Sequence, residues 1–323
     1  EIVQIIHLDN VYLLTVLSFF GAGAFGLFLL ERTYRSAAPL LFGLVLFGGI
    51  FWYGAARMDA NPTASNESVA VHIIQANIPQ EHKWAPEYYE DNFARMVAMS
   101  RPDDATPSAL YHYVFWPETS LMQRHLADPT KRYMLQSALR QYDGQASLIA
   151  GHLRSEGGNA RFFNSTVMLD DAIYDNPALS NIYDKHHLVP FGEYIPLQRY
   201  IPIPVINRFP GFVAGGGPQS FEAPGGFTYS PLICYESIFP HESYDRSGEH
   251  PDFLLNVAND SWYGDSAGPA QHFVQGQFRA IETGIPFIRS TPTGISGVID
   301  PIGRVLEKTL LFEEKKISLF LPE

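Results

Sequence analysis

Two long apolar stretches near the start of the 323-residue chain constrain its fold more than any other feature. Residues 11–30 and 37–56 contain no charged side chain, and each approaches the roughly 20 apolar residues that cross a bilayer as one helix. A secretory signal peptide would place basic residues before the first stretch, whereas Glu1 and Asp9 precede it. We therefore predict a two-helix transmembrane hairpin within residues 1–58, with buried helices of a soluble protein as the alternative.

The charges around this hairpin indicate its orientation. The connecting loop, residues 31–36, carries Arg32 and Arg35, and no lysine or arginine precedes the first helix. Cytoplasmic loops of membrane proteins are enriched in these residues, so we expect the loop in the cytoplasm. The rest of the chain would then lie on the periplasmic side of a bacterial inner membrane.

Composition limits the partners and cofactors. A net charge of −12 without a basic patch argues against nucleic acid as a partner. A single cysteine excludes a disulfide framework and a multi-cysteine metal site. The histidines lack metal-ligand spacing, and the adjacent His186 and His187 are expected to point apart. We therefore predict no metal and no cofactor.

A polar linker over residues 59–68 is expected to end the membrane segment. Residues 69–323 then alternate between strand-like and helix-like patterns, which is typical of a layered α/β domain. The expected strands cover residues 69–76, 111–116, 146–151, 164–169, 182–185, 229–233 and 253–258, with three more up to Leu319. The expected helices cover residues 86–99, 130–142 and 270–283, with another directly after Cys234.

Cys234, the only cysteine, follows an apolar strand-like run in the sequence P-L-I-C-Y-E-S-I-F-P. A thiol between a buried strand and the first turn of a helix lies where the helix dipole favours a thiolate, which is the reactive form. The alternative is a buried cysteine that only packs, since free cysteine is among the most buried residue types.

Two further groups of suitable chemistry also follow strand-like runs. Glu118 ends the sequence W-P-E, and Lys185 precedes the sequence H-H-L-V-P-F-G-E-Y. A carboxylate, an ammonium and a thiol at the carboxyl ends of strands can converge on one pocket. They would supply the base, the oxyanion stabiliser and the nucleophile of acyl transfer from an amide or ester. Taken singly, Glu118 could be a turn residue and Lys185 a solvated surface lysine.

The order of these motifs resembles the nitrilase superfamily. The sequences Q-A-N-I-P-Q-x-x-K-W (residues 75–84), F-G-E-Y, I-C-Y-E and N-D-S-W-Y-G (residues 259–264) resemble its apolipoprotein N-acyltransferase branch. The resemblance implies a four-layer α-β-β-α sandwich behind the hairpin, with Glu118, Lys185 and Cys234 as a catalytic triad. It also implies that Glu193 orients the lysine and the reacting amine. Substrate-binding positions implied by it are Trp84, Tyr235, Glu236 and Trp262.

This family resemblance implies an acyltransferase that takes a fatty acyl chain from a phospholipid as a cysteine thioester. The acceptor would be the N-terminal amine of a diacylglyceryl-modified lipoprotein. Residues 195–212, apolar and rich in proline, are interpreted as a lid at the membrane surface, with a buried connection as the alternative.

The chain also departs from the family. Those acyltransferases resemble a larger membrane domain whose last helix follows the catalytic domain, so we interpret this chain as a fragment or a short relative. Two other functions remain open. One is a carbon-nitrogen hydrolase that passes the acyl group to water, and the other is a non-catalytic homologue of the conjugal-transfer type.

Overall fold

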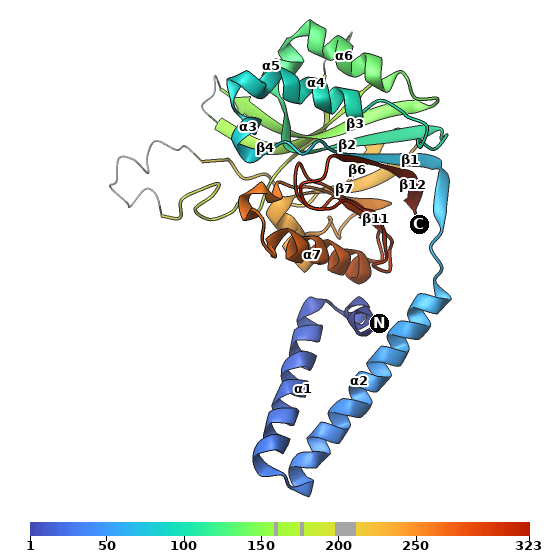
Figure 1. Cartoon of the computed structure of the whole chain (residues 1–323), viewed down its shortest axis with the longest axis vertical. Helices are drawn as coiled ribbons and strands as arrows, with labels where there is room; N and C mark the ends of the chain where they lie inside the picture. Colours follow the sequence, from blue (N-terminus) through green and yellow to red (C-terminus); the bar gives the residue numbers. More distant parts are fainter. Residues whose placement is uncertain (158–160, 175–177, 198–210) are drawn as a thin grey trace.

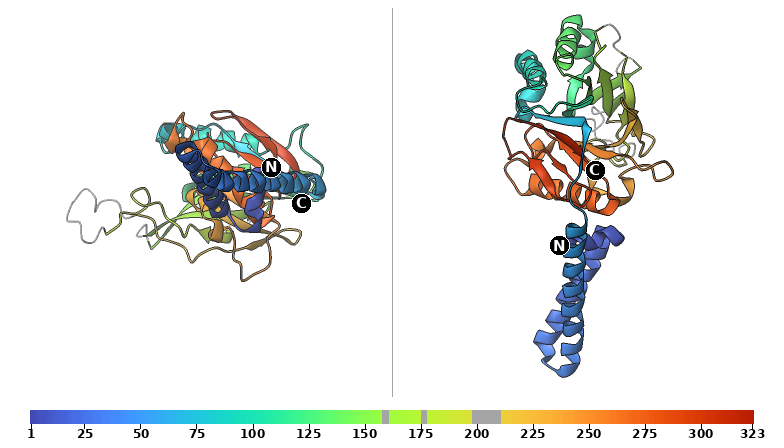
Figure 2. Two further views of the ribbon diagram at one scale, coloured as in Figure 1. Left: turned by 90° about the horizontal axis from the view of Figure 1, so that it is seen from below. Right: turned by 90° about the vertical axis from the view of Figure 1, so that its right-hand side faces the viewer.

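The computed structural model describes residues 1–157, 161–174, 178–197 and 211–323. Two six-stranded sheets lie face to face, with helices on the outer face of each (Figures 1 and 2). The α-β-β-α sandwich expected from the sequence is therefore confirmed. A pair of long helices extends away from this sandwich.

The first sheet has the strand order β12-β1-β2-β3-β4-β5. Strands β1, β2 and β3 are parallel, whereas β4 is antiparallel to both β3 and β5. Strand β5 consequently runs in the same direction as β2, and their carboxyl ends lie at one edge of the sheet. The bounds are β1 (Ser65–Gln75), β2 (Tyr111–Met122), β3 (Gln145–Glu156), β4 (Arg161–Asp170), β5 (Ser180–Asp184) and β12 (Lys315–Pro322).

The second sheet has the order β11-β10-β9-β8-β7-β6, and its central strands β7, β8 and β9 are parallel. Four strands, β9 to β12, follow the last helix, where the sequence predicted three, because a turn after Ile299 separates β10 from β11. The last of them, β12, belongs to the first sheet. The bounds are β6 (Phe221–Ala223), β7 (Phe227–Ile233), β8 (Phe253–Val257), β9 (Phe287–Ser290), β10 (Gly297–Ile299) and β11 (Val305–Lys308).

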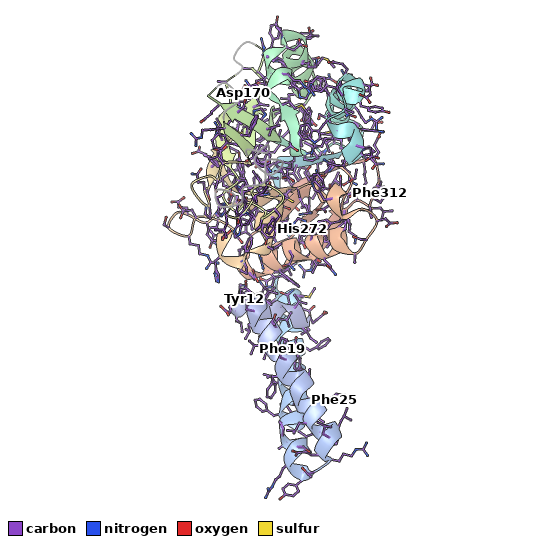
Figure 3. The ribbon with its side chains drawn as sticks, turned by 90° about the vertical axis from the view of Figure 1, so that its left-hand side faces the viewer. Tyr12, Phe19, Phe25, Asp170, His272 and Phe312 are labelled. Carbon is purple, nitrogen blue, oxygen red and sulfur yellow. The ribbon has the colours of Figure 1, made fainter. Side chains whose placement is uncertain are left out.

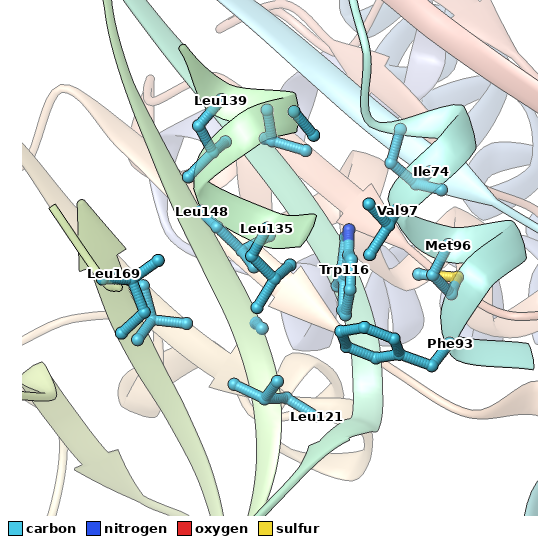
Figure 4. Packing of buried hydrophobic residues seen from close by; sticks show 14 of the residues in the cluster. Ile74, Phe93, Met96, Val97, Trp116, Leu121, Leu135, Leu139, Leu148 and Leu169 are labelled. Atoms are coloured by element: carbon cyan, nitrogen blue, oxygen red, sulfur yellow. The ribbon is translucent and has the colours of Figure 1, made fainter. Parts of the chain in front are cut away.

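Strand alternation builds three apolar layers. On β2, Tyr113 and Phe115 point into the core between the sheets, whereas Val114 and Trp116 face the outer helices. Trp116 packs against Phe93 beneath helix α4 (Figure 4). Helices α4 (Tyr89–Met99) and α6 (Pro129–Leu139) cover the first sheet, with α5 (Gln123–Ala127) beside them, and α7 (Gly268–Thr283) covers the second.

The two predicted membrane helices form a hairpin of α1 (Val11–Glu31) and α2 (Tyr34–Ala60). Both are long and apolar enough to cross a bilayer, and few of their side chains are buried. Figure 3 shows Phe19 and Phe25 projecting from this hairpin into the surroundings. The loop that carries Arg32 lies at the far end from the sandwich (Figure 1).

The other end of the hairpin rests on the sandwich. A short 3-10 helix, η1 (Ile2–Leu8), packs on α7, where Ile6 and Ile281 share a small apolar cluster. The first amide of α1, that of Val11, donates to the Glu282 carboxylate at 2.6 Å. The hairpin is therefore held by the helix that also supports the second sheet.

Two local predictions differ from the structure. Helix α2 continues to Ala60 and β1 begins at Ser65, where it pairs with Pro322 of β12, so the connection is shorter than the predicted linker 59–68. After Cys234 there is no α-helix but a five-residue 3-10 helix, η5 (Cys234–Ile238), because Pro240 disfavours helical geometry at the residue before it. Residues 198–210 of the predicted lid lie outside the described residues.

Candidate active site

Glu118 lies in an irregular part of β2. The pairing of β2 with β3 shifts between Trp116 and Leu121, and Thr119 has a φ of 50°. This bend presses the chain onto β3 so closely that a Cβ on Gly151 would lie 2.5 Å from the Glu118 Cα. A glycine at that position therefore allows the bend, and the bend holds the Glu118 side chain nearly buried, with 7% of the residue exposed.

Lys185 directly follows β5 and is almost completely buried. Its Nζ lies 2.8 Å from Glu193 Oε1 and 4.0 Å from Glu118 Oε1. Burial alone would lower the pKa of this ammonium, but Glu118, Cys234 and Glu193 together raise it above its ordinary value. Lys185 is therefore a fixed cation and cannot serve as a base near neutral pH.

Asn164, on β4, links the two carboxylates. Its side-chain amide donates to Glu118 Oε1 at 2.6 Å and to Glu193 Oε1 at 3.0 Å. The other oxygen of Glu193 accepts the amide of Val189 at 2.8 Å. These bonds fix Glu193, and within the described part of the chain the second carboxylate oxygen of Glu118 accepts no side-chain hydrogen bond.

Cys234 directly follows β7 and has a φ of 50°, a left-handed conformation that costs a residue with a side chain of order 1–3 kcal/mol. Burial raises the pKa of its thiol to about 12, the negative charge of Glu118 adds to this rise, and Lys185 opposes it. The predicted stabilisation of a resting thiolate by a helix is thus wrong, because no α-helix begins here. The thiol needs a base, and the carboxylate of Glu118 is the acidic group that acts most strongly on it.

Glu236 does not face an open site. It is fully buried and its oxygens accept the amides of Ile233 at 2.7 Å, His186 at 2.8 Å and His187 at 3.1 Å. The Tyr183 hydroxyl donates to it at 2.9 Å. Glu236 thus ties the segment after Lys185 to the turn that carries Cys234.

The three predicted substrate-binding aromatic residues differ in exposure. Trp84 is 41% and Trp262 is 75% exposed, so neither belongs to the core. Tyr235 is half-buried and packs edge-on against His187 and Phe239. Large exposed aromatic rings beside Lys83 and after Asp260 are available for contact with a ligand, and their role stays a prediction.

The prediction that His186 and His187 point apart is wrong. Both rings approach the Glu242 carboxylate, at 3.1 Å and 2.9 Å, because this segment is a turn and not a strand. Among the described residues, no group of histidine, cysteine and acidic side chains is arranged to hold a metal ion.

Sequence reasoning missed several residues that complete the site. Asn256 and His272 contact the Cys234 carbonyl oxygen at 3.5 Å and 3.1 Å. His272 also lies 2.8 Å from Asp260, which Arg289 binds through both carboxylate oxygens at 2.8 Å. Lys83 and Asn164 had been read only as parts of a motif and a strand. For Asn256 and Arg289, a single large polar side chain in a short apolar strand was the available signal.

The comparisons with known proteins identify the family of the chain. The carbon-nitrogen hydrolase family matches residues 71–319, and the chain belongs to that family. An apolipoprotein N-acyltransferase of Brucella melitensis is 34% identical over 281 residues, covering 84% of this chain and 51% of that protein. The one of Allorhizobium ampelinum is 35% identical over 314 residues, covering 90% of this chain and 56% of that protein. The resemblance found in the sequence motifs is confirmed, while the chain spans about half the length of these relatives.

Solved structures agree on the fold. A member of branch 10 of the nitrilase superfamily from Saccharomyces cerevisiae has a TM-score of 0.56 at 14% identity, covering 80% of this chain and 92% of that one. A carbon-nitrogen hydrolase superfamily protein from Xanthomonas campestris has a TM-score of 0.53 at 18% identity, covering 78% and 89%. At such low identity these similarities support the sandwich and not a particular substrate.

Proposed function

We propose that this chain is a membrane-anchored acyltransferase of the apolipoprotein N-acyltransferase type. The observation that carries the proposal is the convergence of Glu118, Lys185 and Cys234 at one end of a sandwich that is joined to an apolar hairpin. The similarity to curated apolipoprotein N-acyltransferases supports the choice of substrates. The donor would be a phospholipid, and the acceptor the N-terminal amine of a diacylglyceryl-modified lipoprotein.

In the first half of the reaction, Glu118 takes the thiol proton while the sulfur of Cys234 attacks the ester carbonyl. The carbonyl oxygen becomes an oxyanion, which the ammonium of Lys185 stabilises. When the ester bond breaks, Glu118 returns the proton to the departing alkoxide of the lysophospholipid. The products are a thioester on Cys234 and a neutral alcohol.

In the second half, the free amine of the lipoprotein attacks the thioester. Glu118 accepts a proton from the attacking nitrogen, Lys185 again holds the oxyanion, and the proton returns to the sulfur as the carbon–sulfur bond breaks. Glu193 keeps Lys185 in place through its 2.8 Å contact. The covalent intermediate allows the two lipids to enter at different times.

The hairpin would place this chemistry at the bilayer surface. Its α1 is 21 residues long, which corresponds to about 30 Å at the rise of an α-helix and matches the hydrocarbon thickness. The loop with Arg32 and Arg35 lies away from the sandwich, so the positive-inside rule favours a periplasmic catalytic domain.

Intact-mass measurement tests the proposal directly. The protein in detergent is incubated with phosphatidylethanolamine, beside a Cys234→Ala control. A gain of one acyl chain that hydroxylamine removes, and that the control lacks, is the expected result. A diacylglyceryl peptide should then discharge the acyl chain onto its amine. Discharge to water alone, with no acylated peptide, would favour the hydrolase, and a chain that never acquires an acyl group would contradict the proposal.

A further inference from the structure

Lys83 is a buried cation to which the reaction described above assigns no role. It ends the short helix α3 (Gln80–Lys83), is 8% exposed, and donates from Nζ to the main-chain oxygen of Glu118 at 2.8 Å. Lys83 and Glu118 also line one pocket, together with Phe93, Met96 and His125. An ammonium has three hydrogens, so this contact with Glu118 uses only part of its donor capacity.

The helix that carries Lys83 is attached to the other side of the site as well. The Gln80 side chain accepts from the Asn259 side chain at 2.8 Å. A backbone hydrogen bond from Asn259 in turn lowers the pKa of the Cys234 thiol. Helix α3 therefore bridges the strand of the base and the loop beside the nucleophile.

We propose that Lys83 is a positioning residue of the reaction: its ammonium holds the main-chain carbonyl of Glu118 and supplies a second positive charge that favours the Cys234 thiolate. The first role opposes relaxation of the bend at Thr119. The second supplements Lys185, the cation that acts most strongly on the thiol. The catalytic part of this inference rests on the proposed function, whereas the effect on the thiol does not.

The electrostatic part follows from mutual interaction. Burial lowers the pKa of Lys83 to about 8, while the charges of Glu118 and Cys234 oppose that fall. Because a charge interaction is reciprocal, the protonated form of Lys83 favours the thiolate of Cys234. This support is present below about pH 8 and is lost as the pH rises and Lys83 loses its proton.

Four described groups near the thiol have shifted pKa values that keep their charge constant around pH 8. Lys185 has a raised pKa and stays protonated, Asp260 has a lowered pKa and stays ionised, and Tyr263 has a raised pKa and stays neutral. The pKa of His272 is lowered by burial, so this ring stays neutral. Burial lowers the pKa of His186, but Glu236 and Glu242 outweigh it and raise this pKa, and the His186 ring contacts Glu236 at 2.8 Å, two residues after Cys234. His186 is unchanged in the Lys83 variants, so the difference between wild type and variants near pH 8 reports Lys83.

Alkylation of the single cysteine by iodoacetamide tests the charge effect without any lipid substrate. The variants are Lys83→Met, which removes both charge and donor, and Lys83→Gln, which keeps a donor for the Glu118 carbonyl. Lys131→Met is the matched control, because Lys131 is also 8% exposed but pairs with Glu90 and Asp128. At about pH 6.5 we expect alkylation of both Lys83 variants to be about tenfold slower, as one pKa unit requires. At about pH 10, where Lys83 is already neutral, wild type and variants should converge.

The result that overturns the inference is a rate difference that is equal at both pH values, since that pattern indicates altered access and not charge. An alkylation rate in folded Lys83→Gln that equals the wild-type rate at about pH 6.5 also overturns the inference. If Lys83→Met does not fold, the Lys83→Gln variant alone provides the test. Acyl loading adds the positioning readout: Lys83→Gln should load faster than Lys83→Met. If wild type never loads but the pH-dependent alkylation difference persists, the proposed acyltransferase fails while the charge effect of Lys83 stands.

Discussion

Replacement of Arg289 by methionine should leave the negative charge of Asp260 uncompensated next to the turn that carries Cys234. Arg289 is fully buried, and its guanidinium lies 2.8 Å from both oxygens of Asp260. Asp260 in turn contacts His272, which touches the Cys234 carbonyl at 3.1 Å. Methionine fills similar volume but leaves the Asp260 carboxylate buried, with the His272 imidazole as its remaining side-chain partner among the described residues.

The expected loss at neutral pH is about 3–5 kcal/mol, the usual cost of breaking a buried ion pair from one side. For a domain of this size that corresponds to a fall in Tm of about 10 °C. Burial raises the pKa of Asp260, but Arg289 and His272 outweigh it, so the pKa is lower than usual in the wild type. Wild-type Asp260 therefore contributes stability above its unfolded pKa, which is lost as the pH falls through the folded pKa.

In the variant the sign reverses, because burial then dominates and raises the pKa of Asp260. The charge costs stability at neutral pH, and this cost disappears as the pH falls toward the unfolded value of 3.8. The stability gap between wild type and Arg289→Met should thus narrow between about pH 7 and pH 4. Thermal unfolding in detergent, followed by tryptophan fluorescence, measures this difference in stability at about pH 7 and at about pH 4.

The double variant Arg289→Met/Asp260→Asn separates charge from packing. Since it removes the orphaned carboxylate, it should be more stable than Arg289→Met at neutral pH. A gap that stays constant with pH, together with a double variant no more stable than the single one, would refute the charge argument and assign the loss to packing alone. Iodoacetamide should alkylate Cys234 more slowly in those variants in which His272 loses its fixed position than in the wild type.

Three further substitutions test separate parts of the site. Gly151→Ala would place a methyl group 2.5 Å from the Glu118 Cα and displace Glu118. Acyl loading of Cys234 should therefore fall by more than tenfold. Normal loading in the mass assay would show that the bend at Glu118 is dispensable. Glu193→Gln removes a charge that raises the pKa of Lys185; we expect a lower rate of acyl transfer, with its alkaline limit at lower pH, and an unmoved limit would contradict this. Glu282→Gln leaves the buried Arg279 without its ionic partner, which lies at 2.8 Å. We expect the hairpin to be held less firmly, so limited proteolysis should cleave the connection at residues 61–64 faster. Unchanged cleavage would show that Glu282 does not hold the hairpin on the sandwich.

Much of the fold could be predicted because its signals are local. The strands around Tyr113 and Leu255 are short apolar runs of β-branched and aromatic residues, and α7 has apolar residues at helical spacing. Cys234 follows β7 of the second sheet, so its position depends on how the two sheets pack. Glu118 and Lys185 lie on β2 and directly after β5 of the first sheet, and these two strands run in the same direction. Parallel strands bring their carboxyl ends together whatever the loops do, so this part of the site follows from topology.

The rest could not be predicted, because it depends on contacts between residues far apart in the chain. Lys83 reaches Glu118 across 35 positions, and Asn164 reaches it across 46. The start of η5 is held by Glu236, whose carboxylate accepts the amides of Ile233, His186 and His187. A helix after Cys234 was a reasonable reading of local pattern, but these tertiary bonds stabilise a tighter turn.

The proposed base, Glu118, and the proposed nucleophile, Cys234, have similar local structures. Each lies at or beside a residue of positive φ, Thr119 after Glu118 and Cys234 itself, and such conformations cost of order 1–3 kcal/mol. In both places a buried side chain binds the main-chain carbonyl: Lys83 binds that of Glu118, and His272 contacts that of Cys234. A relaxed turn would rotate these carbonyls away and leave a buried cation and a buried imidazole short of a partner. The strain therefore persists, because its release would cost hydrogen bonds in the interior.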